Sequence, residues 1–256
     1  MSIYQDYEKL IENQLDLPIE SMNFKSQPDY MKILEHVSPQ QGRQYLQNTI
    51  NHFNTSFNQL KDHLIVLCKR IDSVGKPNKC QYTGFTETSP TNLRYIYQAI
   101  LILKEYKKSK LKNIIEIGAG SGGLCFFIQN IAKLYGIKIN SYIIMDLPVV
   151  ERLIHRIKLF YGTDIMDRED VVNKSFLISN YALGELTVEI KQEYYTNVIW
   201  PYCLSGFIIW NTDTTPPFDE EEYKLTYRDE VPKTGKHNRI IVFEKKLKTW
   251  FKKFIV

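Results

Sequence analysis

Apolar residues recur at helical spacing through the first part of the chain. The pattern predicts amphipathic helices over residues 5–15, 38–53, 57–71 and 89–110. Two of these helices have recognisable starts, because Ser38 and Ser89 are each followed by a proline that fits the first helical position. Residues 74–88 are rich in Gly, Pro, Thr and Asn and are predicted to form an irregular loop.

A different pattern begins near residue 113. Short apolar runs predict four strands, over 113–118, 141–146, 174–180 and 206–211. The segments between them predict helices over 121–136, 149–162 and 187–203. Two further strands are predicted over 222–231 and 238–246. Strands and helices in alternation are typical of an α/β fold with a mostly parallel, doubly wound sheet. We place a boundary after residue 88, between a helical N-terminal extension (1–88) and the α/β domain (89–256).

Composition narrows the class of protein. The chain has 256 residues, of which 43% are hydrophobic and 24% charged, and such values are typical of a globular protein with a sizeable core. The net charge of +4 is mild and the basic residues are spread out, so no nucleic-acid partner is expected. The four cysteines form no CxxC pair and are interpreted as reduced thiols. We see neither a signal peptide nor an apolar run of about 18 residues, and we expect a soluble, cytoplasmic protein.

The strongest local signal is a glycine-rich turn after the first predicted strand. Gly118, Gly120 and Gly123 have G-x-G-x-x-G spacing between a buried strand and a helix. Glycines permit a tight turn and let the backbone approach a ligand, and the helix start offers free N–H groups to polar ligand atoms. The turn is therefore interpreted as a nucleotide- or nucleoside-binding site. The alternative is a turn that only packs the helix on the strand.

The residue two positions before the first glycine favours one kind of cofactor. Glu116 would repel the pyrophosphate of a dinucleotide such as NAD, whereas a cationic ligand would be attracted. The sequence from Glu116 through Gly122 resembles motif I of the class I S-adenosylmethionine (SAM)-dependent methyltransferases. That resemblance implies that Glu116, Gly118, Ala119, Gly120 and Gly122 contact SAM.

Asp146 ends the second predicted strand. A carboxylate at this place can accept hydrogen bonds from both ribose hydroxyls, which SAM and NAD both carry. Asp146 and its neighbour Leu147 are therefore assigned to the nucleoside site without a choice between the cofactors. The alternative for Asp146 is a helix N-cap before Leu147 and Pro148.

Four segments resemble a narrower family, the sugar O-methyltransferases. They are residues 89–95, the glycine turn, residues 146–148 and residues 179–186, within a resemblance that covers roughly 80–245. It implies a Rossmann-like, seven-stranded sheet, SAM as cofactor with S-adenosylhomocysteine (SAH) as product, and a sugar or sugar nucleotide as acceptor. Asn180 is assigned to the cofactor site. Arg94 could bind the SAM carboxylate or an anionic sugar nucleotide; its alternative is an exposed helix cation.

A sugar hydroxyl becomes a good nucleophile only when a base removes its proton. Glu185, after the third strand of the α/β part, is the first candidate base, and its alternative is a carboxylate in the first turn of the next helix. His237, in the loop before the last strand, is the second candidate, and its alternative is a solvated loop histidine. No metal is predicted, because the acidic residues near Asp213 lack a histidine–carboxylate spacing.

Three functions stay open from the sequence: a SAM-dependent O-methyltransferase, an NAD-dependent oxidoreductase that uses the same glycine turn, and a methyltransferase-like binding protein without catalysis. The oligomeric state is open too, and a homo-oligomer is one option.

Near the C-terminus, Leu247, Trp250, Phe251 and Phe254 share one helical face. We expect this segment to pack on the domain, with contact to a membrane surface as the alternative.

Overall fold

The computed structural model describes residues 3–166 and 172–246. Its chain forms two compact units that alternate along the sequence. The first unit comprises residues 1–101, 120–131 and 146–164, and the second comprises 102–119, 132–145 and 165–256. The proposed boundary after residue 88 is a sequence-based division and stays a prediction.

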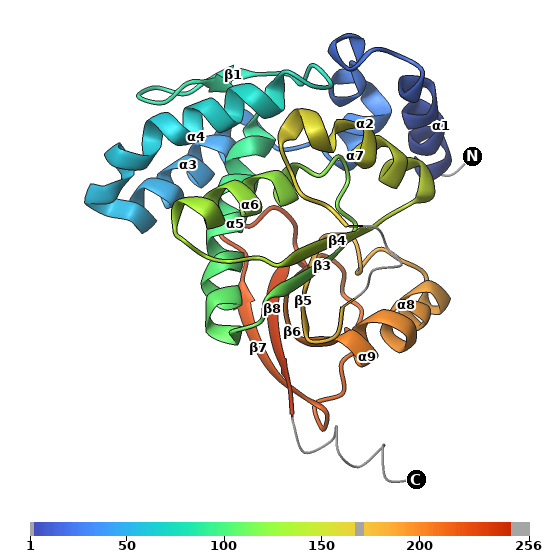
Figure 1. Ribbon diagram of the computed structural model, residues 1–256. Coiled ribbons are helices and arrows are strands. Elements are labelled where there is room, and N and C mark those ends of the chain that lie inside the picture. The colour runs from blue at the N-terminus through green and yellow to red at the C-terminus, as the bar shows by residue number, and fades with distance from the viewer. Residues whose placement is uncertain (1–2, 167–171, 247–256) are drawn as a thin grey trace. The chain divides into compact units, whose positions relative to one another are not determined.

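The first unit is helical. Its N-terminal helices (Figure 1) are α1 (Ile3–Leu15), η1 (Ile19–Ser21), η2 (Phe24–Ser26), α2 (Pro28–Ile33), α3 (Pro39–Phe53), η3 (Asn54–Ser56) and α4 (Phe57–Asp72). It also contains α7 (Pro148–Tyr161) and the first parts of α5 (Pro90–Ser109) and α6 (Gly123–Leu134). The predicted start at Ser38 is confirmed. The Ser38 hydroxyl accepts the Gln41 N–H at 3.2 Å, and the Gln41 side chain accepts the Ser38 N–H at 2.9 Å, which forms a capping box.

The segment predicted as an irregular loop contains a short ladder. Strands β1 (Cys80–Gln81) and β2 (Glu87–Thr88) pair antiparallel, with Cys80 opposite Thr88. The turn between them is closed by a hydrogen bond from the Phe85 N–H to the Tyr82 carbonyl, 3.0 Å. Two residues a side are too few to show the alternation of apolar and polar residues that identifies a strand in a sequence.

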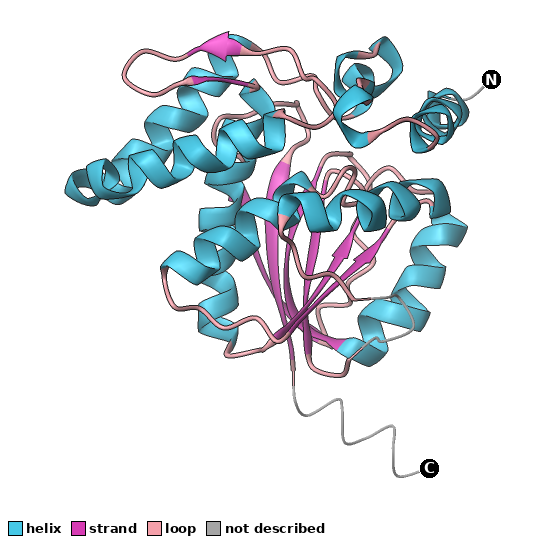
Figure 2. Ribbon diagram, turned by 45° about the horizontal axis from the view of Figure 1, so that its top comes forward, coloured by secondary structure: helices cyan, strands magenta, loops and turns pink. Residues whose placement is uncertain are grey.

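The second unit contains the main sheet. Its strands are β3 (Asn113–Ile117), β4 (Ser141–Met145), β5 (Ser175–Asn180), β6 (Cys203–Trp210), β7 (Tyr223–Asp229) and β8 (Arg239–Lys245), in the spatial order β4-β3-β5-β6-β8-β7. The pairs β4–β3, β3–β5 and β5–β6 are parallel, and β8 is antiparallel to both of its neighbours. Strand β7 therefore runs in the same direction as β3–β6. Figure 2 shows these strands as a twisted fan. The predicted α/β fold with a mostly parallel sheet is confirmed.

The described part of this sheet has six strands, where the resemblance implied seven. Beyond the edge strand β4, Met166 forms a single parallel bridge with Ile143. Residues 167–171, which follow this bridge, lie outside the described residues. The bridge marks the edge at which a further parallel strand would pair.

The helix predicted over 187–203 is divided into three pieces: α8 (Val188–Tyr194), the π-helical turn η5 (Tyr195–Ile199) and α9 (Trp200–Tyr202). Pro201 lies in the last piece and has no N–H to donate to the preceding turn, so a regular helix cannot continue through it. The chain then enters β6 at Cys203, where the prediction still had helix.

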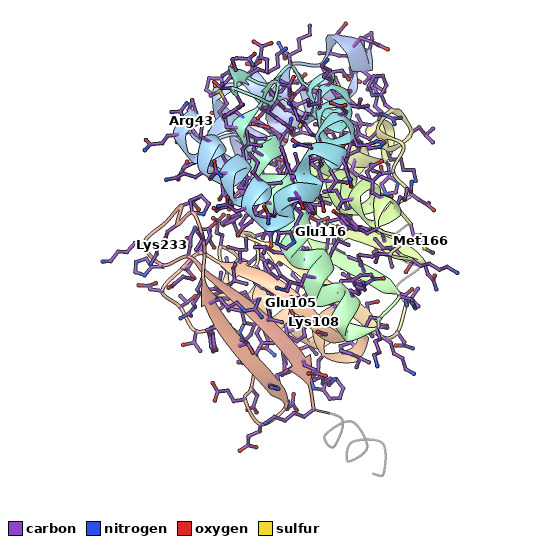
Figure 3. All side chains as sticks on the ribbon, turned by 90° about the vertical axis from the view of Figure 1, so that its left-hand side faces the viewer. Arg43, Glu105, Lys108, Glu116, Met166 and Lys233 are labelled. Carbon is purple, nitrogen blue, oxygen red and sulfur yellow. The ribbon has the colours of Figure 1, made fainter. Side chains whose placement is uncertain are left out.

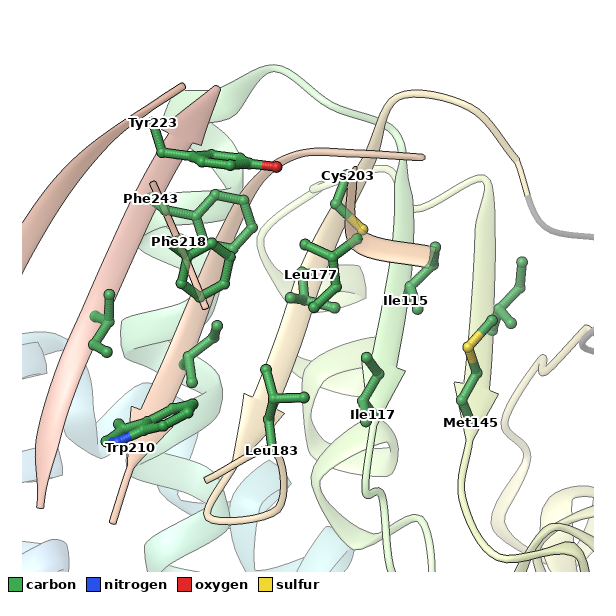
Figure 4. Close-up of a cluster of buried hydrophobic side chains, with 14 residues drawn as sticks. Ile115, Ile117, Met145, Leu177, Leu183, Cys203, Trp210, Phe218, Tyr223 and Phe243 are labelled. Atoms are coloured by element: carbon green, nitrogen blue, oxygen red, sulfur yellow. The ribbon is translucent and has the colours of Figure 1, made fainter. Parts of the chain in front are cut away.

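One face of the sheet is covered by a continuous apolar core (Figure 4). It contains side chains from all six strands and from the segments between them, among them Ile115, Met145, Leu177, Ile199, Trp210, Phe218, Tyr223 and Phe243. The ring of Phe218 stacks on Phe243 at 4.7 Å between centroids. Close packing of this kind holds the strands in register and so fixes the edge where their carboxyl ends meet, which is where open α/β sheets bind ligands.

An ion-pair cluster ties α5 to the edge strand β7. Glu105 is 7% exposed and accepts hydrogen bonds from Arg228 at 2.9 Å and Lys108 at 3.0 Å. Figure 3 labels Glu105 and Lys108 one turn apart on the helix. Burial acts to raise the pKa of Glu105, but the hydrogen bonds and charges of Arg228 and Lys108 outweigh it and lower the pKa below its ordinary value.

This cluster predicts a pH-dependent contribution to stability. A carboxyl whose pKa is lowered by folding stabilises the protein above its unfolded-state pKa, and this stabilisation is lost as the pH falls through the folded-state pKa. We expect Arg228→Ala to reduce the free energy of unfolding by about 0.5–1 kcal/mol at pH 7. Urea titrations at pH 7 and pH 3 measure the effect. An equal loss at both pH values would contradict the assignment to the ionised pair.

Within the described residues, no helix combines the length and the apolar content needed to cross a bilayer. The apolar C-terminal face with Leu247, Trp250, Phe251 and Phe254 lies outside the described residues. Both interpretations of it stay predictions.

Candidate functional site

The glycine turn begins where β3 ends. The Gly118 N–H donates to the Met145 carbonyl of β4 at 2.8 Å, and Gly118 has φ +77°, a conformation that favours glycine. A Cβ on Gly118 would lie 2.0 Å from the Cβ of Ala182, in the segment after β5. Only glycine fits here, because Ala182 has no flexible side chain that could move aside.

The turn continues into the first unit. Gly120 and Gly122 also have positive φ, +58° and +74°, and α6 begins at Gly123, two residues later than the predicted start at 121. A Cβ on Gly120 would lie 2.8 Å from Leu34 Cδ1. The turn is therefore approached closely by a side chain from the N-terminal extension, which the sequence did not indicate.

Asp146 braces the glycine turn. Its Oδ2 accepts the Gly120 N–H at 2.8 Å and its Oδ1 accepts the Leu147 N–H at 2.7 Å. The Asp146 N–H donates to Glu151 of α7 at 2.8 Å. The N-cap alternative for Asp146 is wrong, because Leu147 occupies the N-cap position of α7 and makes no side-chain cap. Both the brace and Glu151 were missed by sequence reasoning.

Glu116 is held inside the second unit. It is 2% exposed, and its Oε2 accepts a hydrogen bond from the Tyr142 hydroxyl of β4 at 2.6 Å. Glu116 and Tyr142 thus project from neighbouring strands on the same face of the sheet. Glu116 is labelled in Figure 3; it is the last residue but one of β3. The sequence pattern identified Tyr142 only as part of an apolar strand, and nothing in that pattern indicated that its hydroxyl would bind Glu116.

Arg94 lies on α5 and is 2% exposed, so the alternative of an exposed helix cation is wrong. One guanidinium nitrogen donates to the Leu34 carbonyl at 3.0 Å, and another lies 3.5 Å from His36 Nε2. The guanidinium also lies over the ring of Tyr95, 5.5 Å from its centroid. Arg94 therefore holds the segment that follows α2, and its assignment to SAM or to an anionic sugar stays a prediction.

Two buried tyrosines of the N-terminal helices lie close to the turn in the first unit. Burial raises the pKa of Tyr30 well above its ordinary value, and the nearby Ser121 side chain opposes this rise. Burial, followed by the negative charge of Asp146, raises the pKa of Tyr7 well above its ordinary value, so Tyr7 stays protonated at neutral pH. Both side chains are buried: Tyr30 is 1% exposed and Tyr7 is 3% exposed. They add two neutral hydroxyl-bearing side chains to the surroundings of Asp146 and Ser121, and neither was predicted from the sequence as a site residue.

Asn180 and Glu185 flank the turn after β5. Asn180 is the last residue of β5 and is paired in register with Ile209 of β6. Glu185 is exposed, and its carboxylate accepts a hydrogen bond from the Asn211 amide, which follows β6. The alternative that placed Glu185 in the first helical turn is wrong, because Thr187 caps α8 and the helix begins at Val188. Asn211 was not singled out in the sequence.

His237 is exposed in the loop between β7 and β8. Since β7 runs parallel to β5 and β6, this loop lies at the same edge of the sheet as the turns after those two strands. The second unit thus places both candidate bases, Glu185 and His237, at the carboxyl edge. Their catalytic roles stay predictions.

No family model and no curated protein matches the sequence. Solved structures do resemble the fold. A protein from Listeria monocytogenes assigned to the class I SAM-dependent methyltransferases has 13% identity and a TM-score of 0.47, over 95% of this chain and 88% of that one. The mitomycin 7-O-methyltransferase MmcR has 11% identity and a TM-score of 0.43, over 92% and 75%. A protein from Streptococcus mutans assigned as a methyltransferase, in complex with SAH, has 9% identity and a TM-score of 0.37, over 56% and 96%. Such distant similarity concerns the fold alone, so the functional argument rests on the residues above.

Proposed function

We propose that this chain is a SAM-dependent methyltransferase. The observation that carries the proposal is the glycine turn from Gly118 to Gly123, with the buried carboxylate Glu116 on the preceding strand, two positions before Gly118. A negative charge at this place attracts the cationic methionyl end of SAM and repels the pyrophosphate of a dinucleotide. The charge therefore favours SAM over NAD for the same turn.

The residues around the turn fit such a cofactor. Each oxygen of Asp146 accepts one backbone N–H. These bonds hold the Asp146 carboxylate beside the glycine turn, and we assign it to the two ribose hydroxyls of SAM, which a carboxylate can accept. The turn itself stays narrow because Gly118 leaves no room for a Cβ beside Ala182. Glu116, Ala119, Gly122, Leu147, Asn180 and Arg94 are proposed as the remaining cofactor residues.

The acceptor is proposed to be a hydroxyl of a sugar or sugar nucleotide. Bound SAM supplies a methyl group activated on its sulfonium; transfer breaks the C–S bond, forms an O–C bond to the acceptor and leaves SAH. The chain has to orient the hydroxyl and take up its proton. Glu185 is an exposed carboxylate at the carboxyl edge, oriented by Asn211, and we assign it as the proton acceptor. His237 is the second candidate.

Calorimetry on the purified chain tests the cofactor. We expect uptake of SAM and SAH with micromolar affinity and no uptake of NAD. Binding of NAD without SAH would favour the oxidoreductase, and binding of neither would refute the proposal.

Methyl transfer from labelled SAM to a panel of sugar nucleotides and neutral sugars tests the acceptor. Labelling of proteins or RNA, with none of the sugars methylated, would contradict the acceptor assignment.

Asp146→Ala tests the placement of the nucleoside. We expect the Kd for SAH to rise about 10- to 100-fold, because the ribose loses a charged hydrogen-bond acceptor and the Gly120 N–H loses its brace. The control is Asp164→Ala, since Asp164 is an exposed aspartate of the same unit. If Asp146→Ala and the control bind SAH equally well, Asp146 does not hold the nucleoside.

A further inference from the structure

Tyr181 is held in an uncommon backbone conformation at the end of β5. Its φ is +63°, in the left-handed region that residues with a Cβ rarely adopt. Such a conformation persists when the surroundings fix it, and it is often found at functional sites. Here the Tyr181 N–H donates to the Ile209 carbonyl at 2.9 Å, and the Tyr181 hydroxyl donates to Glu230. The residue is thus fixed at both its backbone and its side chain.

Glu230 is a buried carboxylate with donors from two loops. It is 4% exposed and directly follows β7. Its Oε1 accepts from Tyr181, whereas its Oε2 accepts from the Thr234 N–H at 2.9 Å, the Thr234 hydroxyl at 2.8 Å and the Asn238 amide at 2.8 Å. Burying a carboxylate is costly unless its lone pairs are satisfied, and these four donors satisfy them. Glu230 therefore holds Tyr181, Thr234 and Asn238 in place relative to one another.

The four donors come from two different loops at the carboxyl edge of the sheet. Tyr181 follows Asn180 in the turn that leads to Glu185, while Thr234 and Asn238 belong to the loop between β7 and β8, on which Figure 3 labels Lys233. Asn238 directly follows His237 and also donates to the Thr234 hydroxyl at 2.8 Å. One carboxylate thus links the turn that carries one candidate base to the loop that carries the other.

We propose that Tyr181 and Glu230 are positioning residues of the acceptor site. This inference rests on the proposed function. The pair sets the distance between the turn after β5 and the loop of His237, and so determines where an acceptor hydroxyl is held. Neither side chain contacts the reacting atoms. The bonds of Glu230 join the two segments that carry the candidate bases, so we expect the pair to act on acceptor binding more than on cofactor affinity.

The primary variant is Tyr181→Phe, which removes only the hydroxyl. The matched control is Tyr227→Phe on β7, since Tyr227 is 47% exposed and a phenylalanine keeps its ring contact with Arg239. Glu230→Gln is a second variant, in which an amide donor replaces an oxygen that now accepts. We expect Tyr181→Phe to raise the acceptor KM about 10-fold or more, with kcat and the SAH Kd changed less than about 2-fold. The acceptor is the best substrate of the sugar nucleotide panel.

A second measurement needs neither cofactor nor acceptor. The imidazole signal of His237 in the NMR spectrum of the full chain can be assigned from its loss in His237→Gln. Tyr181→Phe and Glu230→Gln should shift this signal, whereas the signal of His63, an exposed residue of α4, should stay in place. Tyr227→Phe should move neither signal.

The outcomes separate the two proposals. An unchanged His237 signal together with an unchanged acceptor KM in Tyr181→Phe would overturn the positioning role. A parallel loss of SAH affinity, kcat and Tm would also overturn it, because it would show a general structural defect. Failure of the wild-type chain to bind SAM or SAH would overturn the proposed function, while the His237 signal would still report whether the pair holds the loop.

Discussion

Replacing Gly118 with alanine is expected to destabilise the protein by about 2–5 kcal/mol, because two costs add. A residue with a Cβ pays about 1–2 kcal/mol for the left-handed conformation that Gly118 adopts, φ +77°. The new Cβ would also lie 2.0 Å from the Cβ of Ala182, and forced overpacking costs about 1–3 kcal/mol. For a chain of this size the Tm should fall by about 5–20 °C, which calorimetry measures. SAH uptake should be lost, since the turn cannot keep its path.

Two further variants separate these costs. Gly136 also has a positive φ, +61°, but a Cβ there would meet nothing within 4 Å. Gly136→Ala should therefore show the conformational cost alone, about 1–2 kcal/mol. Adding Ala182→Gly to Gly118→Ala should recover part of the loss, because it removes the overlapping Cβ. If Gly118→Ala is no more destabilising than Gly136→Ala, the close contact with Ala182 is not a constraint on the turn.

Replacing Glu185 with glutamine is expected to reduce turnover about 100-fold or more while the Kd for SAH stays unchanged, because general-base catalysis contributes on the order of 10²–10⁴. Glutamine keeps an oxygen that can accept the Asn211 amide, so the local geometry is preserved while the proton acceptor is removed. Methyl transfer from labelled SAM to the best acceptor of the panel is the measurement.

The control for this variant is Glu193→Gln, an exposed carboxylate on α8 that should leave turnover unchanged. Turnover of Glu185→Gln at the level of this control would show that the base lies elsewhere. His237→Gln would then be the next variant, because His237 lies at the same edge of the sheet. A fall in SAH affinity in Glu185→Gln would place Glu185 in the cofactor site instead.

Local sequence patterns determined the elements of this fold. The apolar runs at 113–118 and 141–146 correspond to β3 and β4, and the glycines at 118, 120 and 122 all have the positive φ that only glycine adopts readily. The start of α3 at Pro39 was predicted from Ser38 and the proline that follows it. These features are decided within a few residues, by side-chain period, turn chemistry and capping, so one sequence suffices to find them.

Features that depend on weak or interrupted local patterns were predicted less well. The β1–β2 ladder has two residues a side and was expected to be loop, and the helix over 187–203 is divided by a π-helical turn before Pro201. Pairing between the two strands decides the ladder, which is too short for a local pattern to record. The interruption of the helix is local, because Pro201 lacks the N–H that a continuous helix needs, and the apolar period alone passed over it.

The sequence by itself determined the α/β fold, the position of the glycine turn and the candidates Glu116, Asp146 and Glu185. Only the tertiary structure decided their partners: Tyr142 on Glu116, the Gly120 N–H on Asp146, and Asn211 on Glu185. Each of these partners lies 26 residues away from its carboxylate. A hydrogen bond acts over about 3 Å, so its partner is chosen by how strands and loops meet in space and not by distance along the chain.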